Sequence, residues 1–400
     1  MEEWKTYKIG EICESVSDTY RGKALDVVLV NTSDVYDGVC LNHTFVPNKN
    51  LKGQFKKTFK RNDILYSEIR PANRRFAFID FEPENYIAST KLMVIRCSEL
   101  VRPRYLYHYL KRQEMLDELQ ALAESRSGTF PQITFSELAL FEINLPNLAT
   151  QDKIVAAIDC FDDKIALNNR INHNLEEQAQ ALYKSWFVDF EPFRDGKFVD
   201  SELGLIPDGW RVATLGEVTS EMRDKVGPRQ DVRVLSPVTT GQLVLSEEFF
   251  TKQVFSESIS KYLIVRPNDF AYNPARVNIG SLGKNEFDFD GCVSPVYVVF
   301  RCETGYEHFF DLYRTMKPFK EEVISRSNGG VRQTLGYKDF ALIKLVYPPM
   351  SAIKEFNTIY SHLLLGMKQC GKENKSLAKQ RDELLPKLMV GDICLRDLTY

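Results

Sequence analysis

Two turn-rich segments of this 400-residue chain open with Ser-Arg-Ser and end on glutamine, namely SRSGTFPQ at 125–132 and SRSNGGVRQ at 325–333. Arginine suits the O6 and N7 acceptors of guanine, and asparagine or glutamine suits N6 and N7 of adenine. Glycine in both segments would let the backbone approach a duplex closely. These residue types predict contacts to DNA, and the candidates are Arg126, Ser127, Thr129, Gln132, Arg326, Asn328, Arg332 and Gln333. For Gln132 and Gln333 an alternative is that they cap or brace the loop.

A second set of candidates follows an Asn-Asp dipeptide that occurs twice, at 62–63 and 268–269. Phosphate contacts position a protein on DNA, whereas contacts to base edges specify the sequence. Residues that match between the two occurrences, such as Arg70 and Arg276, therefore suit phosphate contact or folding. Residues that differ suit base choice. The candidates in this set are Arg70, Asn73, Arg74, Arg75, Arg276 and Asn278.

Basic residues are concentrated between Lys49 and Arg75, although the whole chain has a formal net charge of −3. A local basic face is compatible with DNA binding, because the field depends on how charge is distributed. Lys56, Lys57 and Lys60 are the candidates for phosphate contact, with an affinity that falls as salt rises. The alternative is an ordinary solvated face.

Motifs of the common enzyme classes are missing from the sequence. It contains no GxxxxGK[ST], no GxGxxG after a strand, no GxSxG and no HExxH. The eight cysteines and five histidines lack metal-ligand spacing, so no metal and no cofactor is predicted, and the thiols are expected to be reduced. No apolar run approaches the roughly 20 residues of a membrane span. We therefore expect a cytoplasmic, non-catalytic protein.

The elements that must position these residues occur twice along the chain. A shift of 206 residues carries Trp4 onto Trp210 and the first Asn-Asp dipeptide onto the second, and a shift of 202 carries Pro146 onto Pro348. A period this long indicates two copies of a whole domain and its tail, because solenoid repeats run to roughly 20–50 residues. We call these the first and the second copy.

Each copy combines short strands with helices. In the first copy, branched and aromatic residues predict strands at 26–30, 63–66, 75–79 and 92–95, and apolar spacing predicts one helix over 105–122. In the second copy, the matching strand and helix fall at 297–300 and 308–324.

A heptad pattern of apolar residues follows each copy. Steps of four and three residues continue over more than four heptads, which is typical of a coiled coil, and asparagine falls at the same position in both patterns. The alternative is two amphipathic helices, each packed on its own domain. The predicted seam comprises Ile154, Ile158, Phe161, Ile165, Asn172, Leu175 and Leu182, then Phe356, Tyr360, Leu363, Met367, Asn374, Leu377 and Leu384.

Three phrases at the junctions, ALYKSWFVDFEP (181–192), LGLIPDGW (203–210) and LLPKLMVGDI (384–393), resemble the specificity subunit of type I restriction-modification systems. The resemblance covers essentially the whole chain. It implies an α/β (α+β) protein with two similar globular target recognition domains, separated by two long antiparallel coiled-coil helices with pseudo-two-fold symmetry. The implied segments are 1–148 and 201–350 for the recognition domains, and 149–200 and 351–400 for the spacer helices.

The same resemblance implies the partners. Each recognition domain would read one half of an asymmetric, bipartite site in double-stranded DNA. Two modification subunits would supply adenine methylation, and two ATP-dependent restriction subunits would join them in restricting complexes. A helix of about 35 residues is roughly 50 Å long, and one turn of B-DNA separates half-sites by about 34–36 Å. Such a helix is long enough to set the spacing. The alternatives are a coiled-coil scaffold without DNA specificity, and an enzyme with an unrecognised site.

Overall fold

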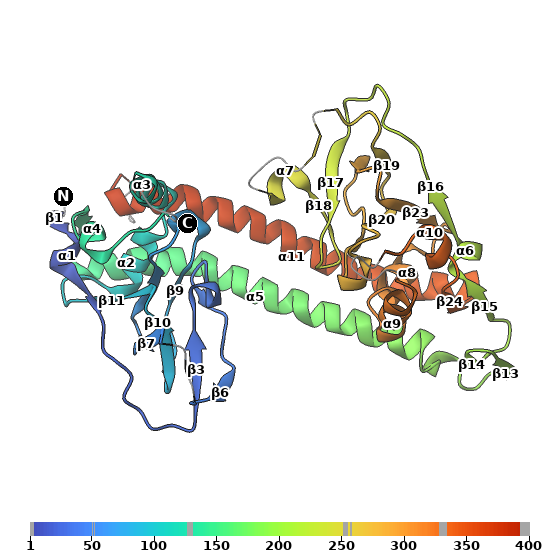
Figure 1. The fold of residues 1–400 in the computed structure, drawn as a ribbon, viewed down its shortest axis with the longest axis horizontal. Coiled ribbons are helices and arrows are strands. Elements are labelled where there is room, and N and C mark those ends of the chain that lie inside the picture. Colours follow the sequence, from blue (N-terminus) through green and yellow to red (C-terminus); the bar gives the residue numbers. More distant parts are fainter. Residues whose placement is uncertain are drawn as a thin grey trace. The chain divides into compact units, whose positions relative to one another are not determined.

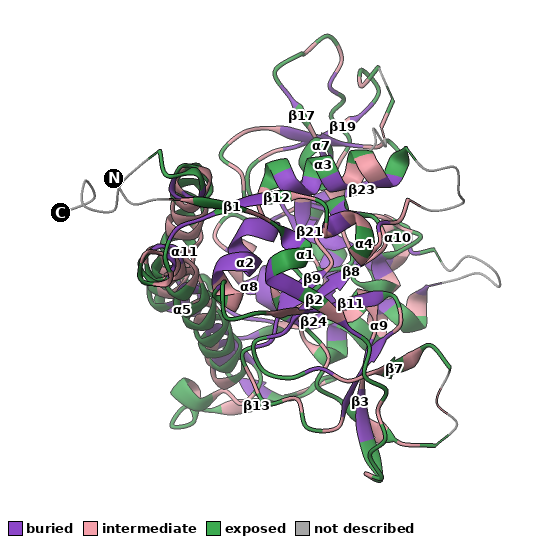
Figure 2. Ribbon diagram, turned by 90° about the vertical axis from the view of Figure 1, so that its left-hand side faces the viewer, coloured by how far each residue is buried: buried purple, intermediate pink, exposed green. Residues whose placement is uncertain are grey.

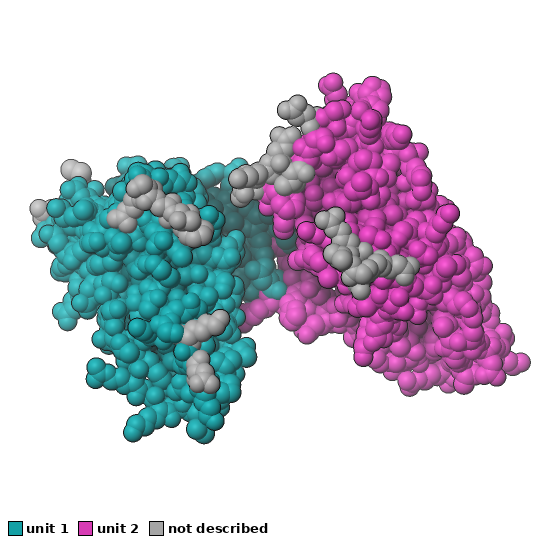
Figure 3. Space-filling view, viewed as in Figure 1, with its two compact units in different colours: residues 1–169, 371–400 teal, residues 170–370 magenta. Residues whose placement is uncertain are grey.

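The chain forms two compact units, residues 1–169 with 371–400, and residues 170–370 (Figure 3). The computed structural model describes residues 4–49, 51, 53–125, 131–250, 255–256, 258–327 and 334–392. Each unit contains one copy of the globular fold and one part of each of two long helices. The mixed class of helix and strand predicted from the sequence is confirmed. No helix within the described ranges has the length and apolar character that crossing a membrane requires.

The first copy begins with a strand and ends with the first long helix (Figure 1). Its strands are β1 Lys5–Lys8, β2 Cys13–Val16, β3 Asp26–Val30, β4 Val35–Tyr36, β5 Val39–Cys40, β6 Phe45–Pro47, β7 Phe55–Lys57, β8 Ile64–Ser67, β9 Phe76–Phe78, β10 Tyr86–Ser89, β11 Leu92–Cys97 and β12 Glu142–Leu145. Its helices are α1 Ile9–Ile12, α2 Pro103–Leu110, α3 Gln113–Glu124, α4 Phe135–Leu138 and α5 Leu148–Phe187, with 3-10 turns η1 Thr32–Asp34 and η2 Pro71–Asn73.

The second copy follows the turn η3 Glu191–Phe193 and the hairpin of β13 Phe198–Ser201 and β14 Gly204–Pro207. Its strands are β15 Arg211–Thr214, β16 Thr219–Met222, β17 Arg233–Pro237, β18 Leu243–Leu245, β19 Leu263–Val265, β20 Phe270–Tyr272, β21 Leu282–Lys284, β22 Gly291–Val293, β23 Val298–Cys302 and β24 Lys344–Tyr347. Its helices are α6 Leu215–Val218, α7 Ser246–Phe249, α8 Glu307–Tyr313, α9 Lys317–Arg326, α10 Tyr337–Phe340 and α11 Met350–Val390, with the turn η4 Val277–Ile279.

The sheets of the two copies have the same strand order. Sheet β2-β11-β8-β9 corresponds to β16-β23-β20-β21, sheet β6-β3-β10-β7 to β18-β17-β22-β19, and the pair β1-β12 to β15-β24. All residues of the central strands β8 (Figure 2) and β20 are buried, and these strands are apolar apart from Ser67. The duplication that the sequence predicts is therefore present in the fold of each unit.

The Asn-Asp dipeptide starts the central strand of each copy. Asn62 and Asn268 have left-handed φ angles of 70° and 69°, which asparagine tolerates better than most residues. The buried carboxylate of Asp63 accepts a hydrogen bond from the backbone N–H of Lys60 at 2.8 Å. It also accepts from two nitrogens of the Arg96 guanidinium, at 2.8 and 2.6 Å.

Asp269 repeats this arrangement in the second copy. Its carboxylate accepts the backbone N–H of Arg266 at 2.9 Å and two nitrogens of Arg301 at 2.6 and 2.9 Å. Removing one member of a buried, hydrogen-bonded ion pair is strongly destabilising, because the other charge remains buried. This explains in physical terms why both copies carry the dipeptide.

The single helix predicted at 105–122 is wrong, because two helices, α2 and α3, occupy this region. The break falls at Lys111 and Arg112, and Arg112 has an extended backbone with φ −59° and ψ 144°. The Nζ atom of Lys111 donates to Asp162 at 2.8 Å, while the guanidinium of Arg112 lies 4.1 Å from the ring centre of Tyr109. The tertiary contact of Lys111 and the local contact of Arg112 favour the turn over a continuous helix.

The helix predicted at 308–324 is likewise divided into α8 and α9. Pro318 occupies the first turn of α9, where the missing N–H costs nothing. The hydroxyl of Thr315 donates to the carbonyl of Leu312 at 2.7 Å and so satisfies one of the last carbonyl groups of α8.

The two long helices pair antiparallel within each unit. In the first unit, Asp162 bonds Arg381 and Asn168 bonds Asn374, so residue numbers rise on one helix as they fall on the other. In the second unit, Tyr183 contacts Phe356 and Leu175 approaches Gly366, with the same result. The seam residues are all buried or half-buried: Ile154, Ile158, Phe161, Ile165, Asn172, Leu175 and Leu182 in α5, and Phe356, Tyr360, Leu363, Met367, Asn374, Leu377 and Leu384 in α11.

The two seam asparagines have different surroundings. Asn374 donates to Asn169 at 2.8 Å and accepts from the buried Asn168 at 2.9 Å. The Oδ1 atom of Asn172 is buried without a hydrogen-bond partner among the described residues. Polar contacts inside a seam favour one register over others. In this helix pair, the contacts that do so are those of Asn374.

The helix pair meets the first copy through buried charges. The Nε2 atom of His108, on α2, lies 2.7 Å from a carboxylate oxygen of Asp159 on α5. Asp162, one turn later, accepts from Lys111 at 2.8 Å and from Arg381 of α11 at 2.6 Å. Burial lowers the pKa of His108 to about 4, and this outweighs the opposite effect of the Asp159 carboxylate.

The helix pair meets the second copy through aromatic rings instead. Phe187 of α5 lies 4.9 Å from Phe309 of α8 and 4.8 Å from Phe356 of α11, between ring centroids. Tyr183 and Trp186 extend this cluster. Apolar residues of the helix pair, including Ile154, Ile158 and Leu388, also pack on the core of the first copy. The first junction therefore combines charge pairs with apolar contacts, whereas aromatic rings dominate the second.

The close packing of α1 on the end of α4, which α6 and α10 repeat in the second copy, can be tested by substitution. A Cβ atom at Gly10 would lie 2.9 Å from the Cβ of Ala139, and one at Gly216 would lie 3.0 Å from that of Ala341. Because overpacking costs about 1–3 kcal/mol, Gly10→Ala and Gly216→Ala should each lower the thermal unfolding midpoint. Gly336→Ala is the control, since nothing lies within 4 Å of that position. Equal midpoints in all three variants would contradict the proposed packing.

The buried His108 predicts an acid-sensitive fold. Its folded pKa of about 4 lies below its ordinary value of 6.5, so the unfolded chain takes up the proton first as pH falls. The free energy of unfolding should therefore fall from about pH 6.5 downward, and this loss should be complete near pH 4. In His108→Gln, urea unfolding between pH 6.5 and 4.5 should depend less on pH than in the wild type. Identical slopes would contradict this assignment.

Candidate nucleic-acid interface

The connection between β8 and β9 is a strained and partly exposed turn, residues 70–75, which we call the η2 turn. Arg70 and Arg74 flank its 3-10 segment, and both have left-handed φ angles, of 47° and 54°. For a bulky residue this conformation carries strain of about 1–3 kcal/mol, and such strain gathers at functional sites. Arg70 and Asn73 are exposed. The η2 turn therefore presents an arginine and an amide to solvent.

The matching connection between β20 and β21, residues 276–281, is called the η4 turn. Arg276 is exposed and Asn278 is half-buried. Ile279 at its tip is 58% exposed, and Gly280 follows with φ 97°. The shift of 206 residues carries Asn73 onto Ile279. Sequence reasoning missed Ile279 because the search was for polar residues, although the same shift could have found it.

In each copy, a backbone hydrogen bond joins the stretch between the central strand and the exposed turn to the residues that follow the Ser-Arg-Ser loop. In the first copy, Ile133 N donates to Glu68 O at 2.9 Å and Arg70 N donates to Pro131 O at 3.1 Å. In the second copy, Leu335 N donates to Pro274 O at 3.0 Å, which is the equivalent of the first bond. Described residues beside the two places that the sequence proposed separately are therefore hydrogen-bonded to each other in both copies.

Several predicted residues of the two loops lie outside the described residues, namely Arg126, Ser127, Thr129, Asn328, Arg332 and Gln333. Gln132 is described and half-buried, and its side-chain oxygen accepts a hydrogen bond from Lys91 at 3.2 Å. This contact agrees with the bracing role considered for Gln132. Arg326 donates to Glu322, one helical turn earlier, at 2.8 Å.

Arg74 and Arg75 make contacts inside the protein. Arg74 donates twice to Asp37, at 2.9 and 2.8 Å, and Arg75 donates to the carbonyl of Ser33 at 3.1 Å. The guanidinium of Arg75 also lies 5.4 Å from the ring centre of Tyr36. Both side chains are half-buried. These contacts favour a supporting role for both arginines.

The predicted phosphate-binding lysines have unequal surroundings. Lys56 and Lys60 are exposed. Lys57 is half-buried, its Nζ atom donates to the carbonyl of Leu92 at 2.8 Å, and burial lowers its pKa. Phosphate contact by Lys57 would require this hydrogen bond to break, so Lys56 and Lys60 are better placed.

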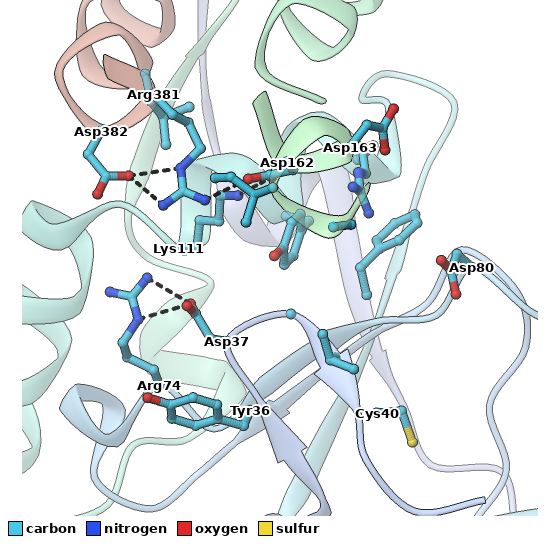
Figure 4. Close-up of a pocket in the computed structure, with 18 of the residues that line it drawn as sticks. Tyr36, Asp37, Cys40, Arg74, Asp80, Lys111, Asp162, Asp163, Arg381 and Asp382 are labelled. Carbon is cyan, nitrogen blue, oxygen red and sulfur yellow. Dashed lines mark hydrogen bonds and ion pairs between the residues drawn. The ribbon is translucent and has the colours of Figure 1, made fainter. Parts of the chain in front are cut away.

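A cavity of about 800 Å³ lies within the first unit, between the β4–β5 hairpin and its part of the helix pair (Figure 4). Six of its charged lining residues form ion pairs: Arg74 with Asp37, Lys111 with Asp162, and Arg381 with both Asp162 and Asp382. These six side chains carry three positive and three negative charges, so together they have no net charge to attract an ionic ligand.

Three potential metal ligands, His108, Asp159 and Asp162, have atoms within 4.8 Å of one another beside this cavity. Their carboxylates are already ion-paired, Asp159 with Arg104 and Asp162 with Lys111. The surrounding positive charge opposes a divalent cation. The group instead fastens α2 to α5.

Comparison with known proteins gives a consistent result. Residues 1–177 match the family described as the type I restriction modification DNA specificity domain. The HindI specificity subunit of a type I restriction enzyme from Haemophilus influenzae is 46% identical over 196 residues, which are 48% of this chain and 43% of that protein. The MjaIX specificity subunit from Methanocaldococcus jannaschii is 27% identical over 310 residues, which are 74% of this chain and 70% of that protein. The match to the Haemophilus relative thus spans less than half its length.

The fold has a solved counterpart. The crystal structure of a type I restriction-modification system S subunit from M. genitalium matches with a TM-score of 0.54 and 16% identity, over 97% of this chain and 96% of that one. At this level of identity the likeness concerns the fold alone. The sequence resemblance to type I specificity subunits is confirmed, and residues 1–177 match the DNA specificity domain family.

Proposed function

From this family match, we propose that the chain is a non-catalytic DNA sequence-specificity subunit of a type I restriction-modification complex. The observation that carries the proposal is a backbone hydrogen bond that repeats between the copies, Ile133 N to Glu68 O and Leu335 N to Pro274 O. It joins the stretch before each exposed turn to the residues after each Ser-Arg-Ser loop. Each copy would read one half of a bipartite site. Since the exposed side chains of the two turns differ, the half-sites should differ too.

The proposed role of each residue depends on whether it matches its equivalent in the other copy. Arg70 and Arg276 are exposed at equivalent positions and suit phosphate contact, together with Lys56 and Lys60. Asn73 and Ile279 are also equivalent but chemically different, which suits base choice. An amide hydrogen-bonds adenine, whereas an aliphatic side chain contacts the methyl group of thymine.

The proposed function implies that the chain binds other protein subunits. Two modification subunits would supply adenine methylation, and two restriction subunits would add ATP-driven translocation and cleavage in a restricting complex. Much of the surface of α5 between residues 169 and 182 is exposed (Figure 2), and this surface would be available for docking. Residues 1–148 and 201–350 would be the target recognition domains, and 149–200 and 351–400 the spacers. The site of action would be the cytoplasm.

The scaffold alternative is disfavoured, because the matching family is a DNA specificity domain. The discriminating experiment is selection from duplexes of random sequence by the chain assembled with its modification subunits. One asymmetric, gapped motif should be enriched, and binding should weaken steeply with salt. Modification subunits alone are the control. A continuous or symmetric motif, or no enrichment by the full complex, would contradict the proposal.

The role of Ile279 can be tested by removing one methyl group from the DNA. Within one half-site, replacing a contacted thymine by deoxyuridine should weaken binding of the wild-type complex, because the apolar contact is lost. Ile279→Ala should weaken binding to the thymine duplex by about 1–3 kcal/mol, as expected for one specific contact. The deoxyuridine substitution should then have little further effect on this variant.

The matched control is Ile324→Ala, since Ile324 is a similarly exposed isoleucine on α9, with 53% of its surface accessible. That variant should keep the full response to deoxyuridine. If Ile279→Ala also keeps it at every thymine of both half-sites, Ile279 does not contact a thymine methyl.

A further inference from the structure

The η2 turn is clamped to the neighbouring β4–β5 hairpin by one ion pair. Two nitrogens of Arg74, Nε and Nη2, lie 2.9 and 2.8 Å from the same carboxylate oxygen of Asp37 (Figure 4). The backbone repeats the connection in the opposite direction, because Asp37 N donates to Arg74 O at 2.9 Å. The turn and the hairpin are thus tied by three hydrogen bonds between two residues.

The conformation of both residues favours this contact. Asp37 and Arg74 have left-handed φ angles, of 43° and 54°. Gly38 follows with φ 101°, and a Cβ atom there would lie 2.1 Å from the hydroxyl of Tyr107. A tight hairpin therefore places the Asp37 carboxylate against the turn, and the arginine accepts a strained backbone to reach it.

Further contacts hold the same turn from its other side. Gln120 of α3 accepts the backbone N–H of Ala72 at 3.1 Å, and Gln113 accepts from Arg74 Nη1 at 3.4 Å. The guanidinium of Arg74 also lies 5.8 Å from the ring centre of Phe76. The exposed Asn73 lies between these anchor points, so its position depends on them.

The second copy holds its turn without such a pair. Gly280 stands where the first copy has Arg74, and a Cβ atom there would lie 2.6 Å from the carbonyl oxygen of Thr239. Backbone packed directly on backbone replaces the ion pair. The Arg74–Asp37 clamp is thus specific to the first copy.

We propose that Arg74 and Asp37 are positioning residues that fix the η2 turn, with Asn73 at its tip, for reading the half-site of the first copy. This inference rests on the proposed function and concerns that copy only. It also changes the role of Arg74 from the one suggested by sequence, where its difference between the copies favoured direct contact with a base.

The test uses the full chain assembled with its modification subunits, and duplexes that carry the selected motif or one mismatch in either half-site. Asp37→Asn keeps the left-handed backbone, because asparagine tolerates it, but removes the charge. Arg74→Lys keeps the charge but removes the fork of donors. Discrimination is the ratio of dissociation constants for mismatched and matched duplexes.

Both variants should lower discrimination in one half-site by about fivefold or more, which is the lower range of what one base pair contributes. Discrimination in the other half-site should be unchanged, whereas a general loss of folding would affect both. The double variant should be no worse than either single variant, because both remove the same contact. Asp152→Asn is the matched control, since Asp152 forms a bidentate pair with Arg102 at 2.8 and 2.9 Å in the same unit.

The other outcomes separate the two proposals. If Arg74→Lys relaxes one half-site and Asp37→Asn does not, Arg74 contacts a base directly and the positioning role is wrong. If neither variant changes discrimination while the wild type discriminates, the clamp does not position the turn. If the wild-type complex discriminates in neither half-site, the proposed function fails, and the positioning role fails with it.

Discussion

A buried carboxylate at the start of the central strand is the constraint on which the rest of each copy depends. The buried carboxylates of Asp63 and Asp269 each accept hydrogen bonds from a backbone N–H and from a bidentate arginine. These bonds fix where β8 and β20 begin. Because each strand runs directly into an exposed turn, the buried pair also determines where the turn emerges.

The framework is constant while the surface varies. The backbone hydrogen bond beside each turn is the same in both copies, but Asn73 corresponds to Ile279, and Arg74 corresponds to Gly280. A pair of domains that reads two different sequences needs this combination. The junctions with the long helices vary in the same way, with charge pairs around Asp162 in one unit and aromatic rings around Phe187 in the other.

Periodic and repeated features could be predicted from the sequence. The duplication, the central strands and the two long helices follow from patterns that local physics imposes. Helices α5 and α11 end at Phe187 and Val390, shortly before Pro192 and Gly391, which are residues that favour helix ends. Features that depend on tertiary contacts could not be predicted. The break at Lys111 and Arg112 needs a carboxylate, that of Asp162, from elsewhere in the fold.

The candidate site was likewise only partly predictable from the sequence. The turn and the Ser-Arg-Ser loop of each copy were predicted as sites of DNA contact, but the sequence does not show that backbone hydrogen bonds join the residues beside them. Arg74 was predicted to contact DNA because it differs between the copies, yet its partner Asp37 lies 37 positions earlier in the chain. An exposed residue and a clamped one look alike in a sequence, and only the partner's position distinguishes them.

The central claim is that each copy reads one half of an asymmetric DNA site. The most direct measurement is a genome-wide map of modified bases in the source strain, with and without this gene. The account predicts that one gapped, asymmetric adenine-methylated motif disappears with the gene and returns when the gene is restored. An unchanged set of methylated motifs, in a strain where the modification subunits are expressed, would contradict it.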